Sequence, residues 1–385
     1  MQSPPAICTT VVINNMKTNK IVPLFVVTFL VVAAAVVVTH KQSPTVSLEK
    51  VLLFPDLKDS INDVNEILIQ SNQGNLTFFN DGGEWKIREA DNFPVLFSKI
   101  RQTAIAVSEL QIVSDKTSNP ALYSNLGVED PASADATSKL LTLRGSSGND
   151  IITLIVGKNR LSSSPSDSPG LYVRLPSQTT ALLVEGRLNV DTQVSDWIER
   201  TLVDIKPERV SHIDIIHGDN QDVTLVRPDE GSDLVLENVP AGKQAKSDYM
   251  MTRMQGILEE ITIDNVRAGT SITLPDDSVK TTVITKDGLV AHITGAELDE
   301  NNYAEFSFQY SAPKGAAPTD TDEGSDTGTG EESDKTMEVE QEVADLNART
   351  SGWVFQIPTY KFDTIVRKLD DLVEDIPEPE ETAED

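Results

Sequence analysis

The chain has 385 residues, of which 61 are acidic and 32 are basic, so its formal net charge is −29. This acidity argues against a nucleic-acid partner, because binding the phosphate backbone requires clustered lysine and arginine side chains. The single cysteine, Cys8, rules out a disulfide framework and a zinc site built from thiolates. With only four histidines as well, the composition predicts no metal site and no cofactor.

The first patterned segment is apolar. Residues 21–38 contain no charged side chain, and a helix of this length spans roughly 27 Å, close to the hydrocarbon thickness of a bilayer. We therefore predict an N-terminal cytoplasmic segment at 1–20 and a transmembrane signal-anchor helix at 21–39. Two alternatives stay open, a cleaved signal peptide with a small-residue site at 33–35 and a translation start at Met16 instead of Met1.

This segment predicts a single-pass membrane protein, with its large C-terminal part outside the cytoplasm. Residues 1–50 carry four basic side chains and one acidic side chain, so the remaining residues carry −32. Much of this charge falls in residues 311–385, which hold 21 acidic and 6 basic side chains. The acidity is therefore not expected to mark an acidic active site.

A short stalk is expected at 40–60, followed by a first module at 61–204. Alternating apolar residues and glycine turns between 64 and 87 predict a β-meander. Apolar residues spaced by three and four from Leu96 to Leu110 predict an amphipathic helix. Strands are predicted at 140–143, 151–156, 171–173 and 181–184, and a second helix is predicted to carry Val194, Trp197, Ile198 and Leu202.

Residues 205–373 repeat this order of elements, so we predict a second, similar module there. Residues 210–215 resemble residues 64–69, displaced by 146 positions, although chance likeness between two β-meanders is the alternative. A helix is expected around Met250, Met251 and Met254, and a closing helix from Phe362 to Val373. The predicted fold class is thus α+β, with a transmembrane helix followed by two mixed α/β modules of mainly antiparallel meander strands and amphipathic helices.

Two acidic stretches are predicted to be disordered, an insertion at 313–343 and a tail at 374–385, because they offer little apolar surface to bury. Asp320, Asp322 and Glu331 fall at ligand positions of a calcium-binding loop. Gly324 stands at a ligand position and Ser325 replaces the turn glycine, so the segment is interpreted as a solvated linker.

The sequence assigns no catalytic, cofactor-binding or metal-binding residue. His212 and His217 are separated by an odd spacing, which puts them on opposite faces of a strand, and His292 has no evident carboxylate partner. No nucleophile elbow, phosphate-binding loop or dinucleotide fingerprint is present. The three tryptophans and the methionine group are interpreted as core residues, in Trp85, Trp197, Trp353, Met250, Met251 and Met254.

Several short motifs together resemble the 4340 family of domains of unknown function. Besides the N-terminal anchor, the first motif comprises Ile67, Ile69, Gly74, Trp85 and Ile87, and the second comprises Leu122-Tyr123, Leu126-Gly127 and Asp130-Pro131. The third comprises Val156-Gly157 and Leu171 to Arg174, and the last runs from Gly352 to Phe355. The resemblance covers roughly residues 48–373. It implies a membrane-anchored bacterial protein of mixed α/β repeats, often encoded beside ABC-type transporter or gliding-motility-like components, with no established catalytic residues.

These sequence features support three hypotheses about function. The first is a non-enzymatic, extracytoplasmic accessory protein that contacts an ABC-type permease or ATPase and is held in the membrane by residues 21–38. The second is an envelope module that binds a small molecule or glycan in a cleft between the two repeats. The third is a hydrolase whose carboxylates come from distant parts of the chain.

Overall fold

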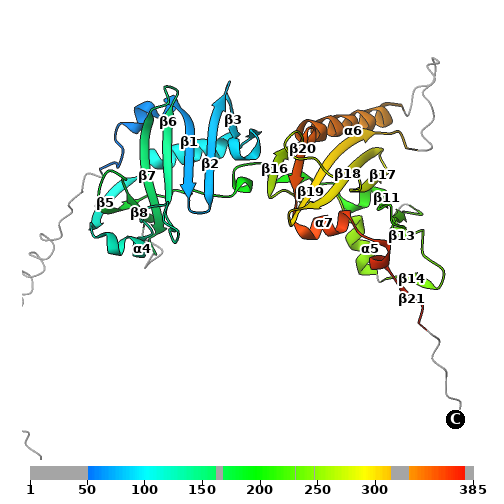
Figure 1. Cartoon of the computed structure of the whole chain (residues 1–385). Coiled ribbons are helices and arrows are strands. Elements are labelled where there is room, and N and C mark those ends of the chain that lie inside the picture. The colour runs from blue at the N-terminus through cyan, green and yellow to red at the C-terminus, as the bar shows by residue number, and fades with distance from the viewer. Residues whose placement is uncertain (1–50, 162–167, 230, 247, 314–328, 378–385) are drawn as a thin grey trace, which may run out of the picture. The chain divides into compact units, whose positions relative to one another are not determined.

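The computed structural model describes residues 51–161, 168–229, 231–246, 248–313 and 329–377. The predicted cytoplasmic segment and transmembrane helix lie outside these ranges, as do Asp320 and Asp322. Among the described residues, no helix is both long enough and apolar enough to cross a membrane. The described part is a mixed α/β structure, dominated by antiparallel strands (Figure 1).

The first sheet has nine strands in the order β4-β3-β2-β1-β6-β7-β8-β9-β5. Every pairing is antiparallel, and the predicted meander is confirmed in its first three strands. The strands are β1 (Val64–Ser71), β2 (Gly74–Asp81), β3 (Glu84–Ile87), β4 (Phe93–Pro94), β5 (Gln111–Thr117), β6 (Lys139–Gly145), β7 (Asp150–Asn159), β8 (Gly170–Arg174) and β9 (Ala181–Glu185).

The core of this sheet follows from alternation along its strands. Ile67 and Ile69 of β1 are fully buried, as expected for side chains two residues apart on one face. The predicted helix is α3 (Phe97–Ser108), which packs against β3. Its residues Ile100 and Val107 are buried because helical spacing places them on one face.

The second sheet has eight strands in the order β13-β12-β11-β17-β18-β19-β20-β16. Its pairings are also antiparallel, and β17 and β18 form a hairpin. The strands are β11 (Val210–Ile216), β12 (Val223–Val226), β13 (Val235–Leu236), β16 (Asn265–Ala268), β17 (Val279–Thr285), β18 (Leu289–Leu298), β19 (Asn301–Tyr310) and β20 (Trp353–Gln356).

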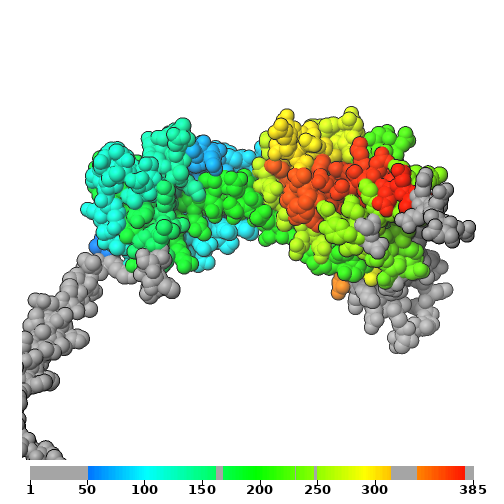
Figure 2. Space-filling model, turned by 90° about the horizontal axis from the view of Figure 1, so that it is seen from below, coloured from blue at the N-terminus to red at the C-terminus, as the bar shows by residue number. Residues whose placement is uncertain are grey.

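Two strand pairs and several short helices complete the fold. The strand β10 (Thr201–Val203) pairs with β15 (Ile261–Thr262), and β14 (Lys243–Ala245) pairs with β21 (Val373–Asp375). In Figure 2 the red C-terminal residues accordingly lie beside green surface. Besides α3 and α6 (Thr329–Thr350), the α-helices of the described residues are α2 (Leu57–Ser60), α4 (Tyr123–Leu126), α5 (Asp248–Gln255), α7 (Thr359–Ile365) and α8 (Leu369–Leu372). The 3-10 helices in the same part of the chain are η1 (Ile61–Asp63), η2 (Arg88–Ala90), η3 (Pro120–Leu122), η4 (Val194–Asp196) and η5 (Pro207–Arg209).

The predicted disordered insertion at 313–343 is wrong from residue 329 onward, where the helix α6 (Thr329–Thr350) begins. Figure 1 shows α6 lying along β18 and β19, which it contacts. The reason is a narrow apolar stripe among acidic residues. Val339 and Leu346 are buried and Val343 packs against the same core, at the spacing of one helix face.

The helix α6 also protects an exposed strand edge. The strand β20 pairs with β19 only at Tyr303 and Ala304, which leaves the far end of β19 without a neighbouring strand on that side. There the Asn347 side chain accepts a hydrogen bond from the Phe308 N–H at 3.0 Å and donates one to the Phe308 carbonyl at 2.7 Å. One amide therefore replaces a partner strand and satisfies backbone groups that would be costly to bury unpaired.

Four other predictions need correction. The stalk at 40–60 is wrong for its second part, since Leu53 donates a backbone hydrogen bond to Leu110 and Leu57 is buried. The helix predicted around Trp197 is the short helix η4 followed by the strand β10. The closing helix is broken into α7, α8 and β21, and β21 takes up Glu374 and Asp375 of the predicted tail. These segments share apolar spacing with helices, but tertiary contacts decide their conformation.

Replacing Leu346 by alanine should lower the free energy of unfolding by about 2–4 kcal/mol, because it removes a buried side chain between α6 and the second sheet. Met337→Ala on the same helix is the matched control, because Met337 is 59% exposed, and it should change the stability by less than about 0.5 kcal/mol. Urea unfolding of both variants measures the difference. Equal effects would mean that α6 does not pack against the sheet.

Candidate functional site

Residues that follow β3 contact the edge strand of the second sheet. Asp91 and Asn92 have φ values of 53° and 68°, in the left-handed region that aspartate and asparagine tolerate better than most residues. This turn presents the Asp91 carboxylate to β16. Its Oδ2 accepts hydrogen bonds from the Arg267 side-chain Nε at 2.8 Å and from the Ala268 backbone N–H at 2.9 Å.

The charge state of Asp91 follows from these contacts. Burial alone favours the neutral carboxyl, but the hydrogen bonds from Arg267 and Ala268 and the positive charge of Arg267 outweigh it, so the pKa of Asp91 is lowered. The carboxylate is therefore ionised at neutral pH. It joins two segments that lie 176 residues apart in the sequence.

Beside this ion pair lies a pocket of about 260 Å³. The Phe93 ring stands edge-on to Trp353, with 4.9 Å between the ring centroids. The side of the pocket formed by the second half of the chain includes Ile263, Trp353 and Arg349. The pocket thus offers aromatic and aliphatic walls together with the guanidinium of Arg349 and the carboxylate of Glu199, which suits a small, partly apolar ligand.

His212 and Asp214 form a pair that the sequence analysis missed. The His212 Nε2 and Asp214 Oδ2 atoms are 2.6 Å apart, and Thr224 donates a hydrogen bond to Asp214 Oδ1 at 3.0 Å. Their spacing of two residues along β11 puts both on one face, and this signal could have revealed the pair. Across the sheet, Thr282 lies opposite Asp214 and also opposite His292, so these side chains form a polar row on the outer face.

The other two described histidines have separate partners, and His217 lies just beyond the end of β11. His217 does not share a partner with His212, because its Nε2 lies 3.0 Å from the Arg367 carbonyl. His292 contacts Thr282 and Gln309 and no carboxylate among the described residues. Within the described ranges, no three His, Cys, Asp or Glu side chains are arranged to hold a metal ion.

The core roles predicted for tryptophan and methionine are confirmed for four of the six residues, whereas Met250 and Trp353 are only half-buried. Trp197 is buried and packs on Phe78 at a centroid distance of 4.4 Å, and Trp85 is buried as well. Met251 and Met254 of α5 are buried. Trp353 is half-buried and lines the pocket beside Phe93, so it is the one tryptophan available to a ligand there.

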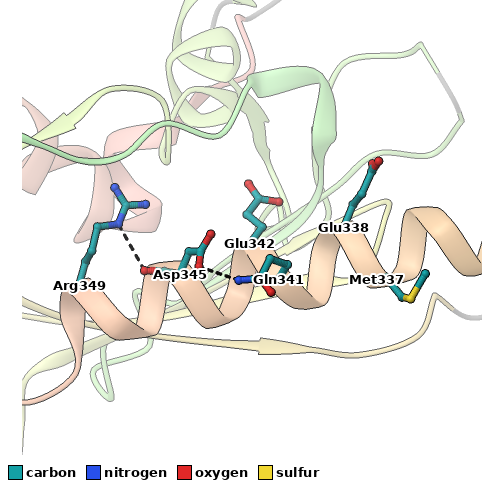
Figure 3. Close-up of a pocket in the computed structure, with 6 residues that line it drawn as sticks. All are labelled: Met337, Glu338, Gln341, Glu342, Asp345 and Arg349. Carbon is teal, nitrogen blue, oxygen red and sulfur yellow. Dashed lines mark hydrogen bonds between the residues drawn. The ribbon is translucent and has the colours of Figure 1, made fainter.

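Three carboxylates of α6 line an open depression, shown in Figure 3, where Glu338 and Glu342 point to one side of the helix and Met337 to the other. Glu342 is engaged in holding the fold. It accepts hydrogen bonds from two guanidinium nitrogens of Arg209, at 2.9 and 2.7 Å, and Arg209 Nε donates to Asp287 at 2.8 Å.

This network has a clear electrostatic effect. The hydrogen bonds to Glu342 and then to Asp287, which outweigh the opposing effect of burial, raise the pKa of Arg209 above its usual high value. Arg209 therefore clamps α6 to the turn between β17 and β18. Because Arg209 engages both carboxylate oxygens of Glu342, this side chain serves to hold α6 in place.

The chain matches the family described as Domain of unknown function (DUF4340) over residues 85–281, just over half of its length, and it belongs to this family. No curated protein matches the chain, and no solved structure does.

A glycine within the matched region has a structural role. A Cβ atom at Gly157 would come within 2.5 Å of the Leu126 carbonyl oxygen and 2.7 Å of the Gly127 carbonyl oxygen, so only glycine lets β7 approach this turn.

Replacing Asp91 by asparagine keeps the side-chain shape and the left-handed turn but removes the charge. We expect it to lower the free energy of unfolding at pH 7 by about 1–2 kcal/mol. Because the folded-state pKa is lowered, the contribution of the wild-type charge is present above the unfolded pKa of about 3.9 and is lost as the pH falls through the folded value.

Urea unfolding at a series of pH values measures this difference. The stability gap between the wild type and Asp91→Asn should be constant from pH 7 to 5 and should close below about pH 4. Arg267→Ala is the companion variant. It removes the partner of the Asp91 carboxylate, so it should remove the same pH-dependent part of the free energy of unfolding. A gap that stays open at low pH would mean that the charge of Asp91 is not what stabilises the contact.

Proposed function

We propose that the chain is a non-enzymatic accessory protein, anchored in the bacterial inner membrane by residues 21–38, which presents two modules in the periplasm and contacts an ABC-type transporter. The observation that carries this proposal is the succession of an uncharged segment of membrane-spanning length and two antiparallel sheets. Family membership supports the ABC-type partner through the genomic setting that the resemblance implies.

The two sheets further support a duplication. Across the sheet, the first runs β3-β2-β1-β6-β7-β8-β9-β5 after its short edge strand β4, and the second runs β13-β12-β11-β17-β18-β19-β20-β16. When the strands of each set are numbered by their order in the chain, the two sheets show the same arrangement of numbers. Each strand of one set therefore has a counterpart in the other. We infer that both halves descend from one module, whose repetition provides two related surfaces for a partner.

A non-enzymatic role accords with how the charged side chains are used. Arg209 binds Glu342 and Asp287, Arg267 binds Asp91, and Arg144 binds Glu66 at 2.7 Å. Each pair joins segments distant in sequence and contributes to the fold. The net charge of −32 over residues 51–385 would keep these modules away from anionic lipid headgroups, leaving their surfaces open to a protein partner.

The test is isolation of the complex from its own cells. The full chain, carrying a C-terminal tag, should bring down an integral ABC-type permease and its ATPase in a mild detergent, identified by mass spectrometry. A matched chain in which residues 21–38 are replaced by an unrelated transmembrane helix should still bring them down if the modules make the contact. Repeated purification of the stable chain alone would contradict the proposal.

A second candidate function is favoured by the pocket beside Phe93 and Trp353. Its aromatic walls and the guanidinium of Arg349 would suit a small ligand with an apolar body and an acidic or carbonyl group. In a thermal-shift screen of metabolites, a genuine ligand should raise the melting temperature of the wild type but not that of Arg349→Ala. Met337→Ala changes an exposed residue of α6 that does not line this pocket, so it should respond like the wild type.

A further inference from the structure

A narrow polar cleft lies between α3 and the segment that follows β9. Its volume is about 190 Å³, and it is separate from the pocket beside Phe93. Seven of its nine lining residues carry polar or charged side chains, in Lys99, Gln102, Thr103, Arg187, Asn189, Asp191 and Asp196, and the remaining two are Ala106 and Trp197. Most ligand pockets are largely apolar, so this lining already indicates a polar ligand.

Both walls of the cleft follow directly from local structure. On α3, Lys99, Thr103 and Ala106 are spaced by four and three residues, which aligns them along one side of the helix. Thr103 is only 6% exposed although it lines the cleft. The helix therefore directs a cation and a nearly buried hydroxyl residue toward the same space.

The opposite wall is an extended segment with alternating burial. Leu188 and Val190 are each 4% exposed, whereas Arg187, Asn189 and Asp191 between and beside them stay accessible and line the cleft. Alternation with a period of two places the three polar side chains on one side. The Trp197 indole N–H holds this segment by donating a hydrogen bond to the Asp191 carbonyl at 3.1 Å.

The polar side chains of the cleft are free to bind a ligand. Within the described residues, none of the seven makes a side-chain hydrogen bond or an ion pair, whereas Arg144, Arg209 and Arg267 are all paired. Among the described residues, the buried side-chain atoms without a hydrogen-bond partner are Gln111 Oε1, Glu129 Oε2 and Arg367 Nε. The Thr103 hydroxyl therefore stays accessible from the cleft, where a ligand can form a hydrogen bond with it. Unpaired donors and acceptors converging on one cleft are the expected arrangement for a site that completes its hydrogen bonds with a ligand.

We propose that this cleft binds one neutral sugar residue of a carbohydrate. Carboxylates accept hydrogen bonds, ammonium and guanidinium groups donate them, and amides do both. Sugar hydroxyls donate and accept at the same oxygen, so they satisfy such an interleaved lining. The two cations Lys99 and Arg187 balance the two carboxylates Asp191 and Asp196, so the site calls for a ligand without net charge.

The size of the cleft agrees with a single sugar ring. A volume of 190 Å³ corresponds to about six water molecules at the liquid volume of about 30 Å³ each, which is enough for one hexose ring with its hydroxyl groups. A wider depression adjoins the cleft and shares Gln102, Ala106 and Arg187 with it. The neighbouring residues of an oligosaccharide could extend there. This proposal does not depend on the accessory role or on the identity of a transporter.

Saturation-transfer NMR on the full chain tests this proposal, in a detergent without a sugar headgroup so that no maltoside or glucoside competes. Glucose, galactose, mannose and N-acetylglucosamine are the probes, added one at a time. At least one should bind saturably with a dissociation constant in the range of about 1–10 mM. Thr103→Val and Asn189→Ala should each weaken binding about fivefold to tenfold, the loss expected for one hydrogen bond.

Met337→Ala is the control, because it changes an exposed side chain of α6 and leaves the cleft intact, so it should bind the sugar like the wild type. Circular dichroism checks that each variant is folded, and Thr103→Val is close to the wild type in shape. The proposal is overturned if no probe saturates below about 100 mM, or if both cleft variants bind as tightly as the wild type. Binding of glycine or glutamate at these residues in place of a sugar would also overturn it.

Discussion

One-sided burial is the constraint on which the rest of this structure depends. Strands such as β1 bury alternate side chains, Ile67 and Ile69, and leave the residues between them accessible, whereas β9 is buried on both faces at 181–184. The same period of two organises the polar features. It puts His212 beside Asp214 on an outer face, and it turns Arg187, Asn189 and Asp191 toward the α3 cleft while Leu188 and Val190 enter the core.

The strands with clear alternation could be predicted from sequence, as could α3, because local pattern and tertiary environment agree there. The strand β5 was missed because its residues do not alternate strictly between buried and exposed positions, so it lacks the period-two pattern by which a strand is predicted. The helix α6 was missed because acidic composition masked the stripe of Val339, Val343 and Leu346. Its docking also depends on a side-chain bridge from Asn347 to Phe308, 39 residues away. Such a bridge leaves no local signal in the sequence.

The candidate sites were harder to predict than the fold. The Asp91–Arg267 contact joins residues 176 positions apart, so no spacing rule could find it. The cleft combines one side of a helix with a segment about ninety residues later in the chain, and each part alone resembles an ordinary solvated surface. What distinguishes the cleft is that its polar groups converge and lack partners, whereas charged groups such as Arg209 and Arg267 are used to join elements. An accessory subunit that also holds a sugar residue would link envelope carbohydrate to its membrane partner.

The central claim is that the two modules lie outside the cytoplasm, and cysteine labelling tests it most directly because Cys8 is the only native cysteine. In a Cys8→Ser chain, Ser147→Cys places one thiol in the exposed turn between β6 and β7. A membrane-impermeant maleimide should label this chain in intact spheroplasts and should not label a cytoplasmic single-cysteine control until the cells are lysed. Labelling of Ser147→Cys only after lysis would place the modules in the cytoplasm and contradict the account.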